Sequence, residues 1–381
     1  MRVIVVGAGL GGLTLAQGLR QAGIDVVVYE RDGTSGRTQG ISLHVDDRGT
    51  AALRACLPPA HAAMAEATMG GPRERMLALS ELDGALAITG TRPVDGLAGR
   101  ARPGRQAHRP LLRAVLLTGL EDVVRFGAEF TRFEQRADGT VRAYFAAGGT
   151  DTADVLVGAD GIGSAVRHQY LPHAQVVDTG RRMLMGATAL RAVADTGLPE
   201  LIGDSPASTQ LRGTMMVLGA LRFTEPPTSA RERWLPALRP SAVGEIDDYL
   251  MWAMPSTQEL LGPAGSPAAM WRRAKDLVAD LPPALQVVVA EAWPDLTVVL
   301  RSGMIPPIPA WPAGPVTVVG DAIHLAPGFG GNLAMQDAHH LCEALVDAYH
   351  GRLDLVDAID AYEDTMRRNS FFVPVAANTG A

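Results

Sequence analysis

The chain has 381 residues, a formal net charge of −7, and 47% hydrophobic and 20% charged residues. This length exceeds that of one ordinary domain and predicts two closely joined domains. The acidic balance disfavours nucleic acid and anionic membrane surfaces as partners, and no apolar run is long enough to predict a membrane span.

Cysteine usage and the first residues of the chain both favour the cytoplasm. Cys56 and Cys342 show no paired spacing, so they predict neither a disulfide framework nor a metal site. The apolar start is interrupted at Gly7 and Gly9 and continues into a strand-helix-strand pattern, so it is not interpreted as a signal peptide. We therefore expect a reducing, cytoplasmic location.

The first thirty residues predict a βαβ unit that holds a dinucleotide. The β-branched run at residues 3–6 fits a buried parallel strand, and a helical period follows it until Gly23. Between them, a G-x-G-x-x-G motif at Gly7, Gly9 and Gly12 allows a tight turn, close approach to a pyrophosphate, and close packing of helix on strand. The positive N-terminal end of the helix would face the phosphates.

An acidic residue completes this unit. Glu30 follows the second strand, at residues 25–29, about 20 residues after the glycines, where the fold places an acceptor for ribose hydroxyls. An acid at this position argues against a 2′-phosphate, so FAD or NAD is the expected ligand. The alternative, a glycine-rich turn without a ligand, does not account for the strand, helix and acid around it.

The next segments alternate short strands with helices. A hairpin is predicted from Met76 to Thr89 around Asp83-Gly84, and another around Asp138-Gly139. Helical spacing of apolar residues begins at Arg109. Residues 90–105 are rich in Gly, Pro and Arg and predict a flexible loop. Other expected elements are strands at 40–45, 123–126, 129–136 and 141–146 and helices at 49–56 and up to about 67.

The second half predicts an inserted domain and a return to the first fold. A buried strand at 154–161 precedes a short helix at 164–170, and a third buried strand at 315–321 precedes a helix at 332–349. The segment between them predicts an antiparallel sheet with helical cover. Its expected strands are 183–190, 214–223 and 249–254, its helices are 268–279 and 284–292, and a last helix is expected at 355–368.

Three apolar strands therefore end in polar turns: the glycine turn, Gly158-Ala159-Asp160-Gly161, and Gly320-Asp321. In a parallel sheet these ends meet at the carboxyl edge, where doubly wound folds hold ligands. Together with the phrase Gly320-Asp321-Ala322-Ile323-His324, the turns resemble the fingerprints of group A FAD-dependent aromatic monooxygenases. This is the para-hydroxybenzoate hydroxylase-like family, and the likeness is near its tetracycline-inactivating type. It covers nearly the whole chain.

The resemblance implies a division of the chain. It indicates an α/β protein in which a Rossmann-like FAD-binding fold carries an inserted antiparallel-sheet substrate domain and a C-terminal helix. The expected parts are FAD-binding segments at 1–72, 106–178 and 303–350, substrate-domain segments at 73–105 and 179–302, and a C-terminal helix and tail at 351–381.

The resemblance also implies roles for single residues. The glycine turn approaches the FAD pyrophosphate, Glu30 binds the adenosine ribose, and Arg113 contacts FAD. Asp160 belongs to a turn shared between FAD and NAD(P)H, Asp321 hydrogen-bonds the ribityl chain, and the loop from Pro327 borders the isoalloxazine where oxygen reacts. The expected cofactor-binding residues are Gly7, Gly9, Leu10, Gly11, Gly12, Glu30, Arg31, Arg113, Asp160, Gly161, Asp321, Pro327, Gly330, Gly331 and Asn332.

The implied activity is an FAD-dependent hydroxylation. NADPH or NADH serves as a transient co-substrate, and a flavin C4a-hydroperoxide transfers oxygen from O2 to a small hydrophobic aromatic or polycyclic substrate, such as an intermediate of secondary metabolism. The flavin carries the chemistry, so no acid-base pair is assigned. A monomer or homodimer without nucleic acid, membrane or metal is expected.

Other activities on the same scaffold stay open. They are a Baeyer-Villiger oxidation, an epoxidation or a dehydrogenation; the W-x-W-x-I-P signature of flavin-dependent halogenases is missing. A flavin-impaired binding protein is a further alternative. Relatives usually have seven residues from the loop Pro to Asn, whereas Pro327 to Asn332 is two residues shorter, and Phe329 replaces a small residue. The shorter loop is expected to affect flavin binding or chemistry.

Several of these residues also have simpler interpretations. Asp160 and Asp321 could be turn-forming or helix-capping acids, and Arg113 could be a surface charge. No zinc-site spacing accompanies His324, His339 or His340.

Methionines recur on the expected strands of the inserted domain. Methionine commonly fills gaps in a core, but one face of this sheet is expected to line a substrate pocket. For each methionine, Met216 and Met254 included, both a core position and a pocket position stay open. The candidates chosen for the pocket are Met183, Met185, Met215 and Met251.

Overall fold

The computed structural model describes residues 1–34, 40–94, 102–244, 246–263, 265–325 and 330–370. Within them, a parallel sheet has the strand order β18-β12-β1-β2-β8. The three strands that precede the polar turns, β1, β12 and β18, thus lie in one parallel sheet, as predicted, with β12 between the other two. The bounds are β1 (Arg2–Val6), β2 (Asp25–Glu30), β8 (Val124–Phe126), β12 (Val155–Gly158) and β18 (Val316–Val318).

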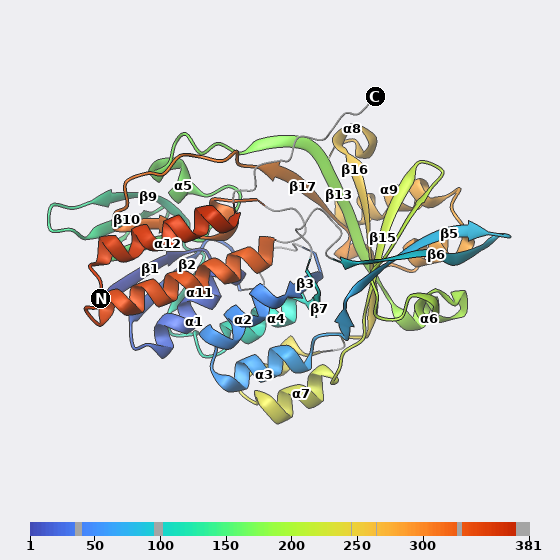
Figure 1. Ribbon diagram of the computed structural model, residues 1–381, viewed down its shortest axis with the longest axis horizontal. Coiled ribbons are helices and arrows are strands. Elements are labelled where there is room, and N and C mark those ends of the chain that lie inside the picture. Colours follow the sequence, from blue (N-terminus) through green and yellow to red (C-terminus); the bar gives the residue numbers. More distant parts are fainter. Residues whose placement is uncertain (35–39, 95–101, 245, 264, 326–329, 371–381) are drawn as a thin grey trace.

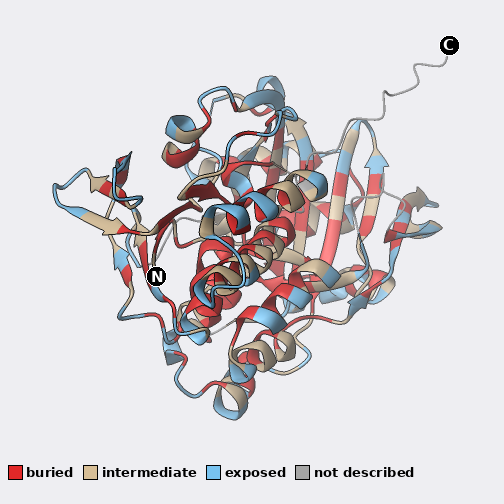
Figure 2. Cartoon of the chain, turned by 60° about the vertical axis from the view of Figure 1, so that its left-hand side comes forward, coloured by how far each residue is buried: buried red, intermediate tan, exposed pale blue. Residues whose placement is uncertain are grey.

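The parallel sheet is buried because its strands are almost entirely β-branched or aliphatic. Val3, Ile4 and Val5 are fully buried, as are Val155 and Leu156 beside them. Such continuous apolar strands need cover on both faces. The helices that pack together over this region are α1 (Leu10–Gln21), α2 (Asp47–Cys56), α11 (Gly330–Tyr349) and α12 (Leu355–Ser370), and Figure 2 shows buried residues concentrated here.

A seven-stranded sheet forms the second half of the molecule (Figure 1). Its order in the described residues is β17-β13-β16-β15-β14-β5-β6, and every neighbouring pair except β14 with β5 is antiparallel. The bounds are β5 (Arg75–Leu82), β6 (Ala85–Pro93), β13 (Val177–Ala189), β14 (Ala207–Leu211), β15 (Thr214–Leu221), β16 (Tyr249–Thr257) and β17 (Val298–Met304).

One face of the seven-stranded sheet has its own core. Trp252, Leu218 and Leu184 are fully buried there, together with residues of α9 (Pro267–Val278) and α10 (Pro283–Ala290). The hairpin predicted around Asp83-Gly84 is confirmed, and both turn residues have positive φ angles, of 50° and 81°. This combination twists the two strands in the sense a tight hairpin needs.

The small sheet β3-β7-β4 lies where the two halves meet (Figure 1). Its strands are β3 (Ser42–Asp46), β4 (Pro72–Arg73) and β7 (Gly104–His108). β7 was not predicted, because its residues begin inside the segment interpreted as a flexible loop; residues 95–101 of that segment lie outside the described part of the chain. The polar sequence of β7 becomes a strand only by pairing with β3 and β4.

The remaining elements are short. The predicted hairpin around Asp138-Gly139 forms a separate sheet with an unpredicted third strand, β11 (Thr150–Ala153). No helix in the described ranges combines the length and apolar character needed to cross a membrane. The other elements are β9 (Phe130–Gln135), β10 (Val141–Phe145), α3 (Pro59–Ala67), α4 (Arg109–Leu117), α5 (Ala165–Tyr170), α6 (Leu198–Ile202), α7 (Pro227–Trp234), α8 (Gln258–Leu261) and the 3-10 turns η2 (Leu190–Thr196), η3 (Pro240–Ala242), η4 (Pro294–Leu296) and η5 (Gly320–Ala322).

The two cysteines, distant in sequence, meet where α1, α2 and α11 pack together. A Cβ placed on Gly18 would lie 2.6 Å from Sγ of Cys342 and 3.3 Å from Sγ of Cys56. Both cysteines are buried, and both are free thiols. The pair therefore forms part of the helical packing of the parallel-sheet half.

Candidate cofactor site

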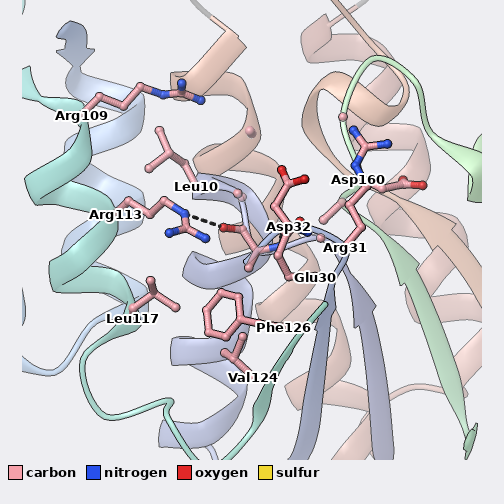
Figure 3. Close-up of a pocket in the computed structure, with 18 of the residues that line it drawn as sticks. Leu10, Glu30, Arg31, Asp32, Arg109, Arg113, Leu117, Val124, Phe126 and Asp160 are labelled. Atoms are coloured by element: carbon pink, nitrogen blue, oxygen red, sulfur yellow. Dashed lines mark hydrogen bonds between the residues drawn. The ribbon is translucent and has the colours of Figure 1, made fainter. Parts of the chain in front are cut away.

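A cavity of about 980 Å³ lies at the carboxyl ends of the parallel strands. Its wall includes residues from all three predicted turns, among them Gly9, Asp160 and Asp321. Figure 3 shows its wall, with Glu30, Arg113 and Asp160 around the same space. The three turns are therefore brought together, at the sheet edge where doubly wound folds bind ligands.

The glycine turn is built for close backbone contact on two sides and is open on a third. A Cβ on Gly7 would lie 2.3 Å from the carbonyl oxygen of Ala159, and one on Gly12 would lie 2.1 Å from that of Gly7. A Cβ on Gly9 would meet nothing within 4 Å. Larger side chains are thus excluded at Gly7 and Gly12, whereas the space beside Gly9 is free for a ligand.

The N-terminus of α1 faces this space without a cap of its own. Gly9 is the N-cap, no side chain accepts a hydrogen bond there, and the first turn contains no acid. The first N–H groups of a helix have no intrahelical acceptor, and the helix dipole is positive at this end. The arrangement suits the phosphates of a dinucleotide.

Glu30 is held at the end of β2 by two backbone donors. Its carboxylate accepts hydrogen bonds from the N–H of Ala8 at 2.8 Å and from the N–H of Asp32 at 2.9 Å. A carboxylate offers about four acceptor positions, so roughly two remain for ligand hydroxyls. The predicted role of Glu30 as a ribose acceptor therefore stays a prediction, and the geometry leaves room for it.

Two arginines of α4 line the opposite wall (Figure 3). Nε of Arg113 donates to the carbonyl oxygen of Ala8 at 3.1 Å, which ties α4 to the glycine turn. Burial lowers the pKa of Arg113, while Glu30 and Asp32 oppose that change. Arg109 was named in the sequence only as the start of a helix, and burial also lowers its pKa against the effect of Asp321. Both remain cations that can face an anionic ligand.

Asp160 lines the cavity and also caps a helix. Its Oδ2 accepts hydrogen bonds from the N–H of Ala165 at 2.7 Å and of Val166 at 3.3 Å, at the start of α5. Oδ1 is buried and has no partner within the described residues. Burial raises the pKa of Asp160. Asp160 therefore both caps the start of α5 and forms part of the cavity wall. Gly161 lies in the same wall.

Asp321 is an exposed residue that lines the cavity. The protein packed around its carboxyl group raises the pKa of Asp321 by desolvation. A Cβ on Gly330 would lie 2.5 Å from its Oδ1, so the start of α11 closes around this carboxylate. A ligand hydroxyl in the cavity could reach it.

Most of the remaining predicted residues line the cavity. Leu10, Gly11, Arg31, Gly330 and Gly331 line the cavity. Asn332 does not: its amide bonds the backbone of Asp46 and His44, on and beside β3. Pro327 and Phe329 lie outside the described residues, so the effect of the shorter loop on flavin binding stays a prediction.

Strand register sorts the methionines by face. Met185 pairs with Ala253 on β16, and Met251 pairs with Ala187 on β13 and Gly219 on β15. Because strand residues alternate between faces, Met183, Met185, Met215 and Met251 share one face, while Met216 and Met254 are on the other, in the helix-covered core. Met185 reaches the cavity region, since a Cβ on Gly40 would lie 3.4 Å from its Sδ. Their role in binding stays a prediction.

Sequence reasoning missed several wall residues. Leu117, Val124, Phe126 and Phe130 give one part of the cavity an apolar lining, and His108 lies near Gly40 and Leu296 in another part. No local motif marks these positions, because they come together only through the packing of α4, β7 and β8. In the described part of the chain, no group of three or more His, Cys, Asp or Glu side chains could hold a metal ion.

Comparison with known proteins agrees with this geometry. A family model described as an FAD binding domain matches residues 307–370, and one described as an NAD(P)-binding Rossmann-like domain matches residues 5–59. A putative FAD-containing monooxygenase from Photorhabdus luminescens has a similar structure, with a TM-score of 0.80, 28% identity, and coverage of 97% of this chain and 94% of the other. The chain is therefore similar, in sequence and in fold, to FAD-dependent monooxygenases.

Curated relatives of this chain extend the comparison. A dual O-methyltransferase/FAD-dependent monooxygenase of Cercospora beticola is 31% identical over 96% of this chain, which spans only 44% of that relative's length. An FAD-dependent urate hydroxylase of Mycolicibacterium vanbaalenii is 29% identical, over 91% of this chain and 80% of the relative.

FAD fits the site that this chain presents. The uncapped N-terminus of α1 and the open side of Gly9 suit a pyrophosphate. The two remaining acceptor positions on Glu30 suit a ribose, and the accessible carboxylate of Asp321 suits a ribityl chain. The apolar wall around Phe126 suits a flat ring.

Proposed function

We propose that this protein is an FAD-dependent monooxygenase that uses NADPH or NADH and O2 to hydroxylate a small aromatic molecule. The observation that carries the proposal is the single cavity at which the glycine turn, the Asp160 turn and the Asp321 turn meet. The urate hydroxylase, which the chain matches over most of its length, supports an aromatic, ring-nitrogen or polycyclic substrate. We further propose a cytoplasmic monomer or homodimer.

Each wall residue has a task in this proposal. The N-terminus of α1 would hold the pyrophosphate, Glu30 the ribose hydroxyls and Asp321 the ribityl hydroxyls. Bound FAD supplies the two-electron chemistry that activates oxygen and transfers one of its atoms to the substrate. Arg113 would add positive charge near the cofactor.

The protein's other contribution is shielding. Ile41 is buried and Leu296 is partly buried, and both line the cavity with apolar side chains. A bound substrate and cofactor would displace water from this apolar part of the cavity. This agrees with the lack of an assigned acid-base pair, because the cofactor carries the chemistry.

The proposal is tested with purified protein, FAD and urate as the first substrate. The expected results are yellow protein, faster NAD(P)H oxidation when substrate is added, and a product with one added oxygen atom and an intact ring skeleton. Ring expansion would favour the Baeyer-Villiger alternative. A colourless protein that shows no thermal shift with FAD would favour a binding protein that has lost flavin chemistry.

A further inference from the structure

His108 is a buried histidine that no part of the proposed cofactor site uses. It is the last residue of β7 and the N-cap of α4, and its side chain makes no cap hydrogen bond. Only 8% of its surface is exposed, yet it lines the cavity, near Gly40, Ile41 and Leu296. It is therefore more than nine-tenths buried and borders the part of the cavity next to the seven-stranded sheet.

The ring nitrogens of His108 lack protein partners. Nδ1 is buried and makes no hydrogen bond in the described part of the chain. Nε2 also makes no hydrogen bond to the described residues, but unlike Nδ1 it is not fully buried. The edge of the ring that reaches the cavity is therefore the one that carries Nε2. Buried polar groups in proteins normally have a partner, so a missing partner requires an explanation.

Aromatic neighbours fix the orientation of this ring. The centroid of Tyr249 lies 5.7 Å from that of His108 at an interplanar angle of 68°, and that of Phe223 lies 6.3 Å away at 63°. The Tyr249 hydroxyl donates to the carbonyl oxygen of Ile41 at 3.3 Å, so it does not satisfy the histidine. The imidazole is thus held by edge-to-face packing and not by hydrogen bonds.

The surroundings keep the imidazole uncharged. Burial lowers the pKa of His108 to about 4, and burial raises the pKa of Tyr249, so both are neutral at neutral pH. A neutral imidazole has one N–H donor and one acceptor nitrogen. It suits a hydroxyl or carbonyl group better than a carboxylate, which would call for a cation.

We propose that His108 is a specificity residue, whose Nε2 hydrogen-bonds a hydroxyl or carbonyl oxygen on the aromatic substrate. The inference rests on the proposed function and adds to it one residue that would recognise an oxygen substituent on the substrate. Gly40 and Ile41 would border the ring, and the contact would set which ring edge faces the cofactor.

The test compares two probes of nearly equal shape, 1-naphthol and naphthalene, in the FAD-loaded protein. Each is titrated while the visible flavin spectrum is recorded, and the ratio of the two dissociation constants is the readout. Losing one hydrogen bond to a buried partner costs about 10-fold in affinity or more, so naphthol should bind at least roughly 10-fold more tightly. His108→Phe should bring the ratio close to one, and His108→Gln should keep part of the preference.

A surface histidine provides the control. His173→Phe, at an exposed position, should leave the ratio unchanged. A general loss of folding or FAD would weaken both probes together, whereas the proposed contact changes only their ratio. An unchanged ratio in His108→Phe would overturn the proposal, as would failure of naphthol to bind the yellow, FAD-loaded wild type. Failure to load FAD at all would instead count against the proposed function.

Discussion

A methyl group on Gly330 would lie 2.5 Å from Oδ1 of Asp321. This distance is well below normal van der Waals contact, so a side chain at position 330 would force the Asp321 carboxylate to move. The contact joins two of the predicted cofactor segments directly. It also offers a way to disturb the cavity without removing any of its polar groups.

Gly330→Ala is expected to weaken FAD binding by about 10-fold or more while the protein stays folded. The Asp321 carboxylate can rotate away from the new methyl group, but it then leaves its position in the cavity wall, and one charged hydrogen bond is worth about 1.5–3 kcal/mol. FAD affinity is measured by quenching of flavin fluorescence. Gly314→Ala is the control, because a Cβ there meets nothing within 4 Å. Equal FAD affinity in both variants would contradict the assigned role of Asp321.

Asp337 of α11 supports the same turn from behind. Its Oδ2 accepts a hydrogen bond from the N–H of Gly320 at 2.9 Å and lies 2.5 Å from Nε2 of His324. Both side chains are buried. Burial lowers the pKa of His324, but the charge and hydrogen bond of Asp337 raise it by more, so the net change in the pKa is upward. The pair therefore anchors Gly320, whose φ angle is +61°.

Asp337→Ala should destabilise the protein by about 3–5 kcal/mol, since it leaves His324 and a buried N–H without their partner. The free energy of unfolding of the FAD-free protein is measured by denaturant titration. Asp347→Ala, on the same helix but in a partly exposed ion pair with Arg352, should cost less than about 1 kcal/mol. Similar losses in the two variants would show that the buried pair has no special role.

Glu363 predicts a pH dependence of stability. It is fully buried on α12 and accepts a hydrogen bond from the Thr317 hydroxyl at 2.8 Å. Burial raises its pKa from 4.5 to about 7. The folded state thus binds this proton more tightly than the unfolded state, so the contribution is largest below about pH 4.5 and is lost as the pH rises to about 7.

Glu363→Gln should remove this component. The stability of wild type relative to the variant is expected to fall by up to about 3 kcal/mol across that pH window. Glu232→Gln, at an exposed position on α7, serves as the comparison and should follow wild type. A difference between wild type and Glu363→Gln that does not change with pH would mean that Glu363 is not protonated in the folded protein.

The packed thiols lead to a simpler prediction. Contact with Cys342 and burial raise the pKa of Cys56, so little thiolate forms. Ellman's reagent should leave both cysteines of the native protein unmodified and should react with both in denaturant. Rapid reaction before unfolding would contradict their burial, and a mass lower by two hydrogens would show a disulfide.

The parallel-sheet half could be predicted from sequence because its local signals agree with one another. The β-branched runs before Gly7, Asp160 and Asp321 indicated buried strands, and glycine and acid spacing placed them in one edge. Their place in one parallel sheet is confirmed by the order β18-β12-β1, an adjacency that the sequence did not predict. Each of these segments carries its own pattern, so no knowledge of distant contacts was needed.

Elements that depend on distant partners were missed. β7 is polar and is stabilised by pairing with β3 and β4, and β17 pairs with β13, which lies far away in sequence. β14 pairs with the neighbouring β15 on one side but with the distant β5 on the other. The same limit applies to the site. Arg109 and His108 line the cavity because α4 and β7 pack against it, and only strand register separates Met251, which shares a face with the cavity-side residues, from Met254 in the core.

The central claim is that the three turns form one FAD site. Titration of the FAD-depleted protein with FAD in an isothermal calorimeter tests it most directly. We expect saturable binding of one FAD per chain and a visible flavin spectrum that stays with the protein through gel filtration. Absence of a binding signal from a folded protein, with the flavin eluting separately, would contradict the account.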